Sequence, residues 1–576
     1  QISIVDSLAQ INILKGFDIR DQLSKYYYRP SINQQYQTNI SGGGSNQKYF
    51  ISGGYDRNFP STEGKSYKRL TLNVSNTYYM LQNRLEIFTN VLYTSSTTKT
   101  SPSITALYPY EQLAGSNGNP LPVDRVVRQS YAVGAGNGKL LNWLYKPLEE
   151  LKNGYSTNTA DLSDYKINLA INYSILKSFK ASALYSYERG ILEGNTLDEL
   201  ESFKARNYIN SYTQIDPVTS VVGYPVPMGG LLANSLSQSK SHNGRVQLEF
   251  NNSVGKHSIN AILGSEIKDF SNINNTIQYY GYNPETSSNQ NATVNYTADY
   301  NNIMGSGSAK IPTNTSQSGL TNRYFSYYFN GSYTYSNKYV VSLSARRDES
   351  NIFGVSTNQK GVPLWSAGLA WNAAYEDFMY FNWLSLLKLR VTYGLTGNVD
   401  NSLSAYLTSD VSSGFIGKFN APYAVIVNTS NPSLRWEKNK NFNLGLDFGL
   451  ISNKLTGSID YYKKSGSDLI GNSPIAPQTG INLFRGNTAN TQTNGFDLQI
   501  ISTNLNGNFK WSTTLLYNHI TSKVTDYQVS NGSNLNVVIG NYNNPLKGYP
   551  YYSIFGFKYA GLNSSGDPQG YLNGGL

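Results

Sequence analysis

Long stretches of this sequence alternate strictly between apolar and polar residues, and this period of two constrains the fold more than any other feature. In the stretch Tyr165 to Ile175, every odd-numbered residue is Tyr, Ile or Leu, and every even-numbered residue is Lys, Asn, Ala or Ser. Successive side chains of a β-strand point to opposite faces, so this pattern predicts a strand with one apolar and one polar face. The stretch is about twice as long as an ordinary strand and matches a tilted strand that crosses a bilayer.

The same unit, two long alternating strands around a tight turn, recurs along the chain and predicts about sixteen strands in all. After a turn at Leu176 to Ser178, the apolar row returns through Phe179, Ala181, Ala183, Tyr185 and Tyr187. Further hairpins are predicted at Tyr67 to Tyr93 (turn Gln82-Asn83), Arg245 to Phe270 (Gly255-Lys256), Tyr324 to Arg346 (Ser336-Asn337-Lys338), Phe442 to Tyr462 (Ser452-Asn453-Lys454) and Phe496 to His519 (Asn506-Gly507).

The connections between hairpins are of a different kind, because Thr94 to Asp164, Gly190 to Asn243 and Ser271 to Asn322 are long and rich in Asn, Ser, Gly and Pro. Outer-membrane barrels combine short periplasmic turns with long extracellular loops, whereas compact soluble domains rarely carry several such loops. In hydrocarbon every backbone donor and acceptor must be paired, and strands achieve this only in a closed barrel. The pattern therefore predicts an all-β, transmembrane antiparallel β-barrel whose apolar row faces lipid and whose polar row faces a wet lumen.

Tyrosine is abundant, with 48 residues in the chain. Tyrosine rings suit the interfacial girdle of a barrel, where ring and hydroxyl meet different solvents. We assign Tyr78, Tyr79 and Tyr93, and likewise Tyr461 and Tyr462, to such a girdle. The alternative is that these rings pack the core of a soluble β-sandwich.

Composition and charge exclude several other classes. Cysteine is absent, which excludes disulfides, thiol nucleophiles and cysteine-ligated zinc. The formal net charge of +10 comes from scattered Lys and Arg with no basic run, so we expect no nucleic-acid partner. No stretch approaches the roughly 18 apolar residues of a membrane helix, and the start Gln1-Ile2-Ser3 does not resemble a signal peptide.

The second half of the chain resembles the SusC/RagA group of TonB-dependent outer-membrane transporters. The order of the motifs matters more than any single match. The resembling motifs are Arg346-Arg347-Asp348-Glu349-Ser350-Asn351-Ile352-Phe353-Gly354, Pro363 to Trp371, Leu387 to Asn398, Asn431-Pro432-Ser433-Leu434-Arg435-Trp436-Glu437, Asp460-Tyr461-Tyr462 with Asp468-Leu469-Ile470, and Asn494-Gly495-Phe496-Asp497; upstream they are Ser41-Gly42-Gly43, Tyr108-Pro109-Tyr110 and Asn142 to Leu151.

The resemblance implies a barrel of about 22 strands with a plug domain. We find neither a plug nor a TonB box, and the chain stops at Gly574-Gly575-Leu576, so we expect a fragment or a barrel completed by other segments. Residues 1–33 are interpreted as a loop segment that follows the absent plug, and residues 34–576 as a barrel that is incomplete at its C-terminus.

The resemblance also implies a function and partners. A large oligosaccharide or peptide would be captured under a SusD-like surface lipoprotein, and TonB-ExbB-ExbD would drive its import through the plug region. Outer-membrane lipid and lipopolysaccharide would surround the wall. Neither catalytic residues nor a cofactor is implied, and the residues that contact the ligand are not identified.

Several motifs suggest other chemistry and are better explained by structure. Gly134 to Lys139 resembles a phosphate loop, but Val133 and Leu140 replace residues that the loop requires. Gly42-Gly43-Gly44-Ser45 is interpreted as a periplasmic turn. Leu140 to Leu151 predicts one short helix within a loop, because Pro147 interrupts the pattern. No metal site is expected from His242, His257 and His519, which are far apart in the sequence.

Paired carboxylates leave a hydrolase open as an alternative, although nothing in the sequence fixes their separation. A secreted or surface-anchored glycan-binding adhesin is a further alternative, and it should have shorter strands and be soluble without detergent. The paired carboxylates are Glu149-Glu150, Asp198-Glu199-Glu201 and Glu376-Asp377.

Overall fold

The computed structural model describes residues 4–104, 107–305, 307–351, 361–379, 381–400, 403–412, 423–474, 476, 478, 483–529, 534–538 and 545–571. The motif residues Ile352, Phe353 and Gly354 and the terminal residues Gly574, Gly575 and Leu576 lie outside this described part. The chain divides into two compact units. One comprises residues 1–171, 184–243 and 269–321, and the other comprises residues 172–183, 244–268 and 322–576.

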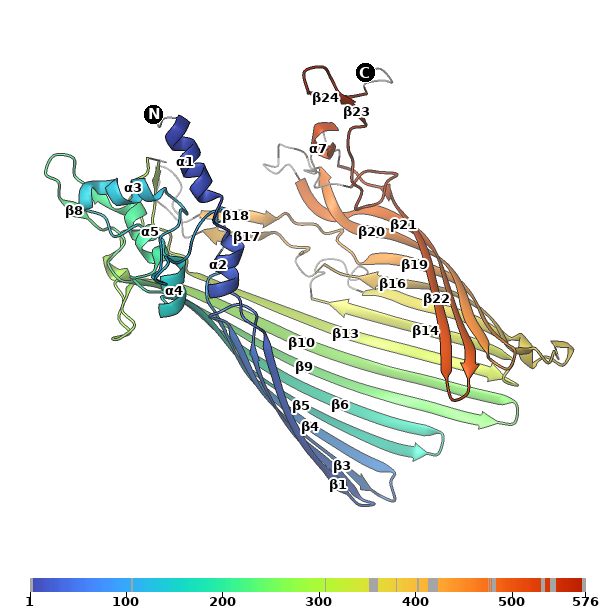
Figure 1. Cartoon of the computed structure of the whole chain (residues 1–576). Coiled ribbons are helices and arrows are strands. Elements are labelled where there is room, and N and C mark those ends of the chain that lie inside the picture. The colour runs from blue at the N-terminus through green and yellow to red at the C-terminus, as the bar shows by residue number, and fades with distance from the viewer. Residues whose placement is uncertain are drawn as a thin grey trace. The chain divides into compact units, whose positions relative to one another are not determined.

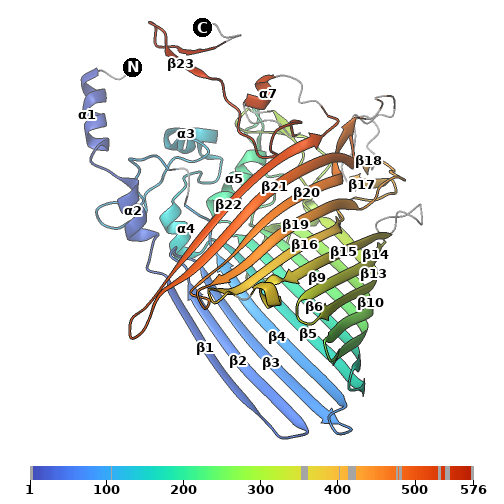
Figure 2. The same ribbon diagram turned by 90° about the vertical axis from the view of Figure 1, so that its right-hand side faces the viewer.

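Sixteen long strands form one antiparallel sheet in which each strand pairs with the next long strand along the chain (Figures 1 and 2). This confirms the predicted fold class and strand number. The strands are β1 (Ile32–Gly43), β2 (Gln47–Phe59), β3 (Ser66–Met80), β4 (Leu85–Thr100), β5 (Ser156–Leu176), β6 (Phe179–Asp198), β9 (Gly230–Val254), β10 (His257–Tyr282), β13 (Ser316–Tyr335), β14 (Tyr339–Ser350), β15 (Gly361–Asn372), β16 (Leu384–Asn398), β19 (Glu437–Leu450), β20 (Leu455–Pro474), β21 (Leu483–Asn506) and β22 (Lys510–Asp526).

The predicted hairpin turns are confirmed at each position. Left-handed backbone conformations occur at Gln82 and Asn83, at Ser336 and Asn337, and at Gly255. Tight hairpins require positive φ, which Gly and Asn adopt at low cost. At these turns the sequence therefore sets the register of the hairpin locally.

The apolar rows lie on the surface of the sheet and not in a core. On β5, Ile167, Leu169 and Ile171 are 42%, 37% and 39% exposed, whereas the alternate residues Asn168 and Ala170 are half-buried. A soluble β-sandwich would bury such rows between two sheets. The arrangement contradicts the sandwich alternative and is that of a wall whose apolar face meets lipid.

Several strands continue well past the predicted ends of their hairpins. β9 has 25 residues and β10 has 26, more than twice the roughly 9–11 residues that a bilayer requires. The three loops predicted at Thr94–Asp164, Gly190–Asn243 and Ser271–Asn322 are therefore shorter, at residues 101–155, 199–229 and 283–315. Ladder hydrogen bonds do not require apolar side chains, so the polar ends of the strands stay paired although the alternation has ended.

The assignment of both tyrosines of each consecutive pair to the girdle is wrong. Tyr78 and Tyr461 are 39% and 43% exposed on the apolar face. Tyr79 and Tyr462 follow them directly in β3 and β20, and neighbouring residues of a strand point to opposite faces. Only one tyrosine of each pair can therefore meet the membrane interface.

Helices occur in the connections and before β1. In the first unit, α2, α4 and α5 lie at the ends of the strands where the long loops are, as Figure 1 shows. None of the helices in the described ranges is long and apolar enough to cross a membrane. The helices are α1 (Ile4–Leu14), α2 (Ile19–Tyr26), α3 (Gln129–Gly134), α4 (Pro147–Asn153), α5 (Phe203–Tyr212) and α7 (Asn534–Val538).

Candidate ligand-binding face and loop assembly

The polar face of the sheet carries ion pairs that join neighbouring strands. Arg69 on β3 pairs with Asp56 on β2 at 2.6 Å, Lys166 on β5 with Glu188 on β6 at 3.3 Å, and Arg245 on β9 with Glu266 on β10 at 3.1 Å. Each of these cations is balanced by a carboxylate on the same face. Between such pairs the face presents amide and hydroxyl groups, which suit a ligand recognised by hydrogen bonds more than by net charge.

A three-residue ion cluster crosses β16, β19 and β20. Arg390 donates from Nε and Nη2 to Asp447 at 2.9 and 2.8 Å, and its Nη2 also lies 3.2 Å from Asp460. Gly445 lies under the guanidinium, because a Cβ at this position would be 2.7 Å from Arg390 Nη2. The missing side chain of Gly445 therefore makes room for one arginine to bridge two carboxylates.

We expect Arg390→Leu to lower the free energy of unfolding by about 1.5–3 kcal/mol, because hydrogen bonds to charged groups are lost and two carboxylates are left facing each other. Unfolding by urea in detergent micelles measures the loss. The matched control is Arg347→Leu. Arg347 forms a well-exposed ion pair with Glu349, two residues further along β14. Exposed pairs contribute about 0–1 kcal/mol. Equal losses in the two variants would contradict the role of the cluster.

A second polar cluster lies at the short-turn connection from β15 to β16. Glu376 accepts hydrogen bonds from the Tyr339 hydroxyl, from Lys338 Nζ at 2.9 Å and from the Trp371 indole at 3.2 Å. These bonds, led by that of Tyr339, lower the pKa of Glu376 to about 2. The carboxylate thereby ties the β13–β14 turn to the next connection.

A pH dependence follows from the lowered pKa of Glu376. Because the folded pKa lies below the ordinary value, the stabilisation is fully present above about pH 4.5 and is lost as the pH falls towards 2. We expect Glu376→Gln to destabilise the protein at pH 7 and the difference from wild type to shrink between pH 4.5 and 2. Thermal unfolding of both proteins across this range tests the expectation. A difference that is constant with pH would contradict it.

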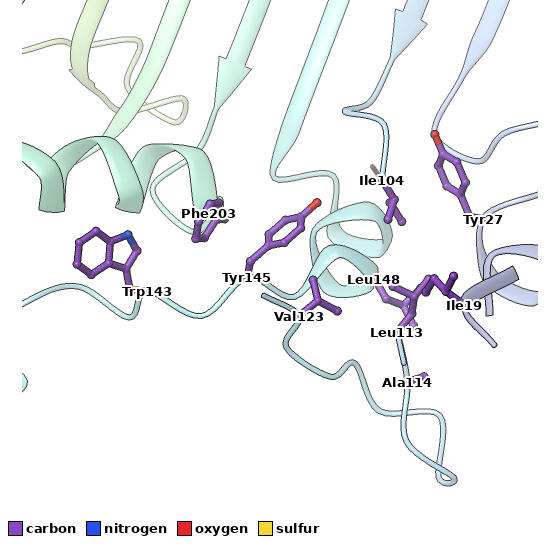
Figure 3. Packing of buried hydrophobic residues seen from close by; sticks show 10 residues of the cluster. All are labelled: Ile19, Tyr27, Ile104, Leu113, Ala114, Val123, Trp143, Tyr145, Leu148 and Phe203. Atoms are coloured by element: carbon purple, nitrogen blue, oxygen red, sulfur yellow. The ribbon is translucent and has the colours of Figure 1, made fainter. Parts of the chain in front are cut away.

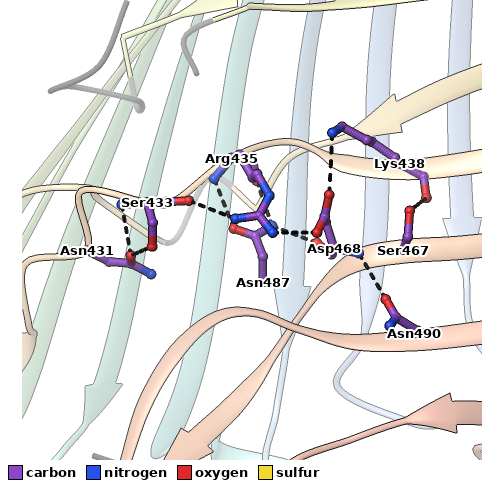
Figure 4. A network of polar contacts seen from close by, with 8 residues as sticks. All are labelled: Asn431, Ser433, Arg435, Lys438, Ser467, Asp468, Asn487 and Asn490. Carbon is purple, nitrogen blue, oxygen red and sulfur yellow. Dashed lines mark hydrogen bonds and ion pairs between the residues drawn. The ribbon is translucent and has the colours of Figure 1, made fainter. Parts of the chain in front are cut away.

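Two of the sequence motifs meet in a polar network in the second unit (Figure 4). Arg435 Nη2 lies 2.6 Å from Asp468 Oδ1, and Lys438 Nζ lies 3.5 Å from Asp468 Oδ2. Asn487 joins them: its side chain accepts from Arg435 N at 2.9 Å and donates to the backbone oxygens of Arg435 at 2.8 Å and Asp468 at 2.6 Å. Asp468 has φ +58 where the β20–β21 register shifts, so the network fixes an irregular backbone.

The long loops of the first unit form an ordered assembly with its own apolar core (Figure 3). Trp143 is 2% exposed, and its indole donates to Asn207 of α5 at 2.9 Å. Asn210 of α5 bonds both the backbone N and O of Leu141 at 2.9 Å. The core residues, which we call the loop core, are Ile19, Tyr27, Ile104, Leu113, Ala114, Val123, Trp143, Tyr145, Leu148 and Phe203.

Charged groups are half-buried at the edge of the loop core. Glu150 accepts from the backbone N of Phe203 at the start of α5, and its carboxylate lies 3.9 Å from Arg206 Nη2. Burial raises the pKa of Glu150 and lowers that of Arg206. Burial also raises the pKa of Tyr145 to about 12. Glu150 and Arg206 thereby join α4 to α5, because a carboxylate withdrawn from water is stabilised by such partners.

The loops and the strand ends also line an open cavity of about 540 Å³. Glu199, Glu201 and Glu285 line it, together with the backbone of Gly229 and Gly281. Gly229 has φ +143, and a Cβ there would lie 2.6 Å from the carbonyl carbon of Gly281. Glycine is therefore required at 229, where the chain before β9 touches the end of β10.

The three histidines considered as metal ligands lie in the strands of the sheet, and two of them contact tyrosines. His242 Nδ1 and the Tyr185 hydroxyl are 2.7 Å apart, and so are His257 Nδ1 and the Tyr333 hydroxyl; His519 lies in β22. Within the described residues, no group of three or more His, Asp or Glu is placed to hold a metal ion.

The paired carboxylates form ion pairs. Glu149 pairs with Lys146, Asp198 with Lys204 and Glu376 with Lys338. The segment 134–139 is the end of α3 followed by a short 3-10 helix, and the predicted short helix within the loop is α4, which begins at Pro147. The glycine-rich segment near residue 43 is the predicted turn, between β1 and β2.

Comparison with known proteins decides between the remaining classes. The sequence profile of the family described as "TonB dependent receptor-like, beta-barrel" matches residues 110–574, most of the chain. The chain belongs to this family. Members of the TonB-dependent receptor-like β-barrel family are outer-membrane receptors and transporters and not enzymes, so the hydrolase and adhesin alternatives are set aside.

Individual relatives agree with the SusC/RagA resemblance. TonB-dependent receptor P3 of Formosa agariphila is 25% identical over 97% of this chain and 53% of its own length. TonB-dependent receptor SusC of Bacteroides thetaiotaomicron is 28% identical over 37% of this chain and 23% of its own length. The solved RagAB peptide importer in its closed-closed state has a TM-score of 0.73 at 17% identity, covering 96% of this chain and 59% of that chain, which shows the shared fold. The chain spans about half the length of the curated relatives that it matches over most of its length.

Proposed function

We propose that this TonB-dependent receptor-like chain forms the wall and extracellular loops of a transporter that imports a large nutrient, an oligosaccharide or a peptide, across the outer membrane. The observation that carries the proposal is the two-faced wall. Its apolar rows are exposed as lipid requires, and its other face is rich in amides and hydroxyls with paired charges. Residues 34–576 are the wall and loops in this proposal, and residues 1–33 are a segment that precedes them.

The loops support capture of a ligand at the outer surface. Long loops with a buried core and a half-buried ion pair provide a fixed surface, and fixed surfaces bind without a large ordering cost. We propose that a SusD-like lipoprotein closes over this surface and that TonB-ExbB-ExbD supplies the energy through a plug domain. The relatives named SusC and RagAB favour this partnership.

The experiment is uptake in cells that carry or lack the full-length gene. Fluorescently labelled oligosaccharides and peptides are offered, and cell-associated label is measured with and without an uncoupler of the proton gradient. We expect gene-dependent accumulation of one ligand class that the uncoupler abolishes. Accumulation that is equal in the deletion strain, for every ligand offered, would contradict import by this protein.

Two observations favour different ligand classes, and the uptake measurement distinguishes between oligosaccharide and peptide. The amide- and hydroxyl-rich, charge-balanced polar face favours a neutral saccharide, because peptides carry charged termini that a balanced face does not select. The description of RagAB as a peptide importer favours a peptide. The labelled ligand that accumulates decides between them.

A further inference from the structure

A cavity of about 520 Å³ lies on the wall and not in the loops. It is formed by β6, β9, β10 and the start of β13, which are consecutive strands of the sheet. One amide side chain from each strand lines it, with two aliphatic side chains beside them. The amides are Asn195, Asn234, Asn275 and Gln317, and the aliphatic residues are Leu236 and Ile277.

The amides form a row across the strands. Ser235 Oγ donates to Gly194 O, which places Asn195 of β6 opposite Asn234 of β9. Ser237 Oγ donates to Asn272 Oδ1, so these two residues lie opposite each other. Because the strands are antiparallel, Asn234, three residues before Ser237, lies opposite Asn275, three residues after Asn272. Four amide side chains therefore meet in one cavity, which Glu193 of β6 also lines.

These amides have no partners of their own in the part of the chain that the structure describes. Asn195, Asn275 and Gln317 make no side-chain hydrogen bond there, and Asn234 Oδ1 is buried without a partner. Asn195, Asn234 and Asn275 are half-buried. Buried polar groups are nearly always hydrogen-bonded, so an unpaired amide oxygen indicates a group that the cavity receives from outside.

The row lies on the outer face of the wall. Asn195 is an even number of residues from Tyr185 and Tyr187 in β6, and Asn234 is an even number from His242 in β9. Side chains at even separations point to the same face. Tyr187 and His242 contact each other with ring centroids 4.9 Å apart, at the end of the apolar row that begins at Phe179.

The height of the row follows from the geometry of a strand. Asn195 is about 26 Å along β6 from Tyr187, which corresponds to about 20 Å along the membrane normal for a tilted strand. Arg189 and Lys240, the next residues of the same face beyond Tyr187 and His242, lie where lipid phosphates are expected. The amide row is therefore above the phosphates, on the side of the long loops.

We propose that this cavity binds a sugar of the lipopolysaccharide core in the outer leaflet. Amides donate and accept hydrogen bonds to sugar hydroxyls, and Leu236 and Ile277 offer apolar contact to the ring faces. At this height on the outer face, the neighbouring saccharide is that of lipopolysaccharide, while an imported nutrient would pass on the other face. The site anchors the protein laterally in its membrane, which goes beyond the proposed import.

The test measures binding of purified rough lipopolysaccharide with a complete core, and of lipid A alone, to the full-length protein in detergent. The variant is Asn195→Ala/Asn234→Ala/Asn275→Ala. We expect its Kd for rough lipopolysaccharide to rise at least tenfold and its Kd for lipid A to stay unchanged. The control Asn274→Ala changes an amide one residue from Asn275 on the opposite face of β10 and should leave both Kd values unchanged.

A second variant separates binding from folding. Asn234→Leu keeps the branched shape of the side chain and removes the unpaired oxygen, so we expect weaker binding of rough lipopolysaccharide with no loss of thermal stability. Unchanged binding in both cavity variants would overturn the proposal, and so would equal loss of binding to lipid A. Binding of free maltoheptaose, with no preference for rough lipopolysaccharide over lipid A, would assign the cavity to a nutrient glycan and overturn the proposed source.

Discussion

Leu169→Arg hinders stable insertion of the wall in the membrane and lowers the amount of folded protein in cells. Leu169 lies near the middle of the exposed apolar row of β5. An arginine on the lipid face near the bilayer midplane costs about 2–4 kcal/mol, a large part of the stability of a typical protein. The heat-modifiable band of the full-length protein on gels, measured in isolated outer membranes, should fall severalfold.

The neighbouring position provides the control. Ala170 follows Leu169 in β5 and is half-buried on the polar face, so Ala170→Arg places the same charge on the other side of the wall. We expect near-normal amounts of folded protein for Ala170→Arg. Equal losses in the two variants, or a larger loss for Ala170→Arg, would mean that the apolar row does not face lipid.

Trp143→Ala opens the loop core without unfolding the wall. Trp143 is among the largest fully buried side chains of the described part, and replacing a buried Trp by Ala costs about 3–5 kcal/mol. The hydrogen bond to Asn207 is lost as well. We expect limited proteolysis of the full-length protein in detergent to cleave residues 101–155 at least tenfold faster, and ligand uptake to fall with it.

The matched control for this variant is a large aromatic residue on the loop surface. Tyr131 contacts the Trp143 ring but is 46% exposed, so Tyr131→Ala removes an aromatic ring without creating a cavity. Its proteolysis rate should change less than threefold. Rapid cleavage within the strands of the Trp143→Ala variant would show that the loop core supports the whole wall, contrary to our expectation.

The regular part of the fold could be predicted because each strand carries its own local signal. Alternation from Tyr165 to Ile175 predicts a strand with two different faces, and Asn506-Gly507 predicts a turn. Neither prediction requires the partner strand to be known. The apolar alternation ends before the strands do, because Thr94 to Thr100 has none although it stays in the ladder. Composition groups consecutive tyrosines such as Tyr461 and Tyr462 together, although neighbouring residues of a strand face opposite sides.

The site could be predicted only in part, because its contacts join residues that are distant in the sequence. The motifs around Arg435 and Asp468 could be recognised in the sequence. The ion pair between these two residues could not be predicted from it. Glu150 and Arg206 approach across 56 positions of chain, and no local pattern signals such a contact. The amide row of Asn195, Asn234 and Asn275 depends on the register between strands, which no single strand encodes.

Alternate residues of each strand face lipid and water, and spin-label accessibility measures this most directly. The chain contains no cysteine, so single cysteines can be introduced at 167 through 172 of the full-length protein in lipid vesicles, and each can carry a nitroxide spin label. We expect accessibility to oxygen, which partitions into lipid, to peak at 167, 169 and 171, and accessibility to a water-soluble nickel complex to peak at 168, 170 and 172. Low accessibility of 167, 169 and 171 to both relaxants, as in a packed core, would contradict it.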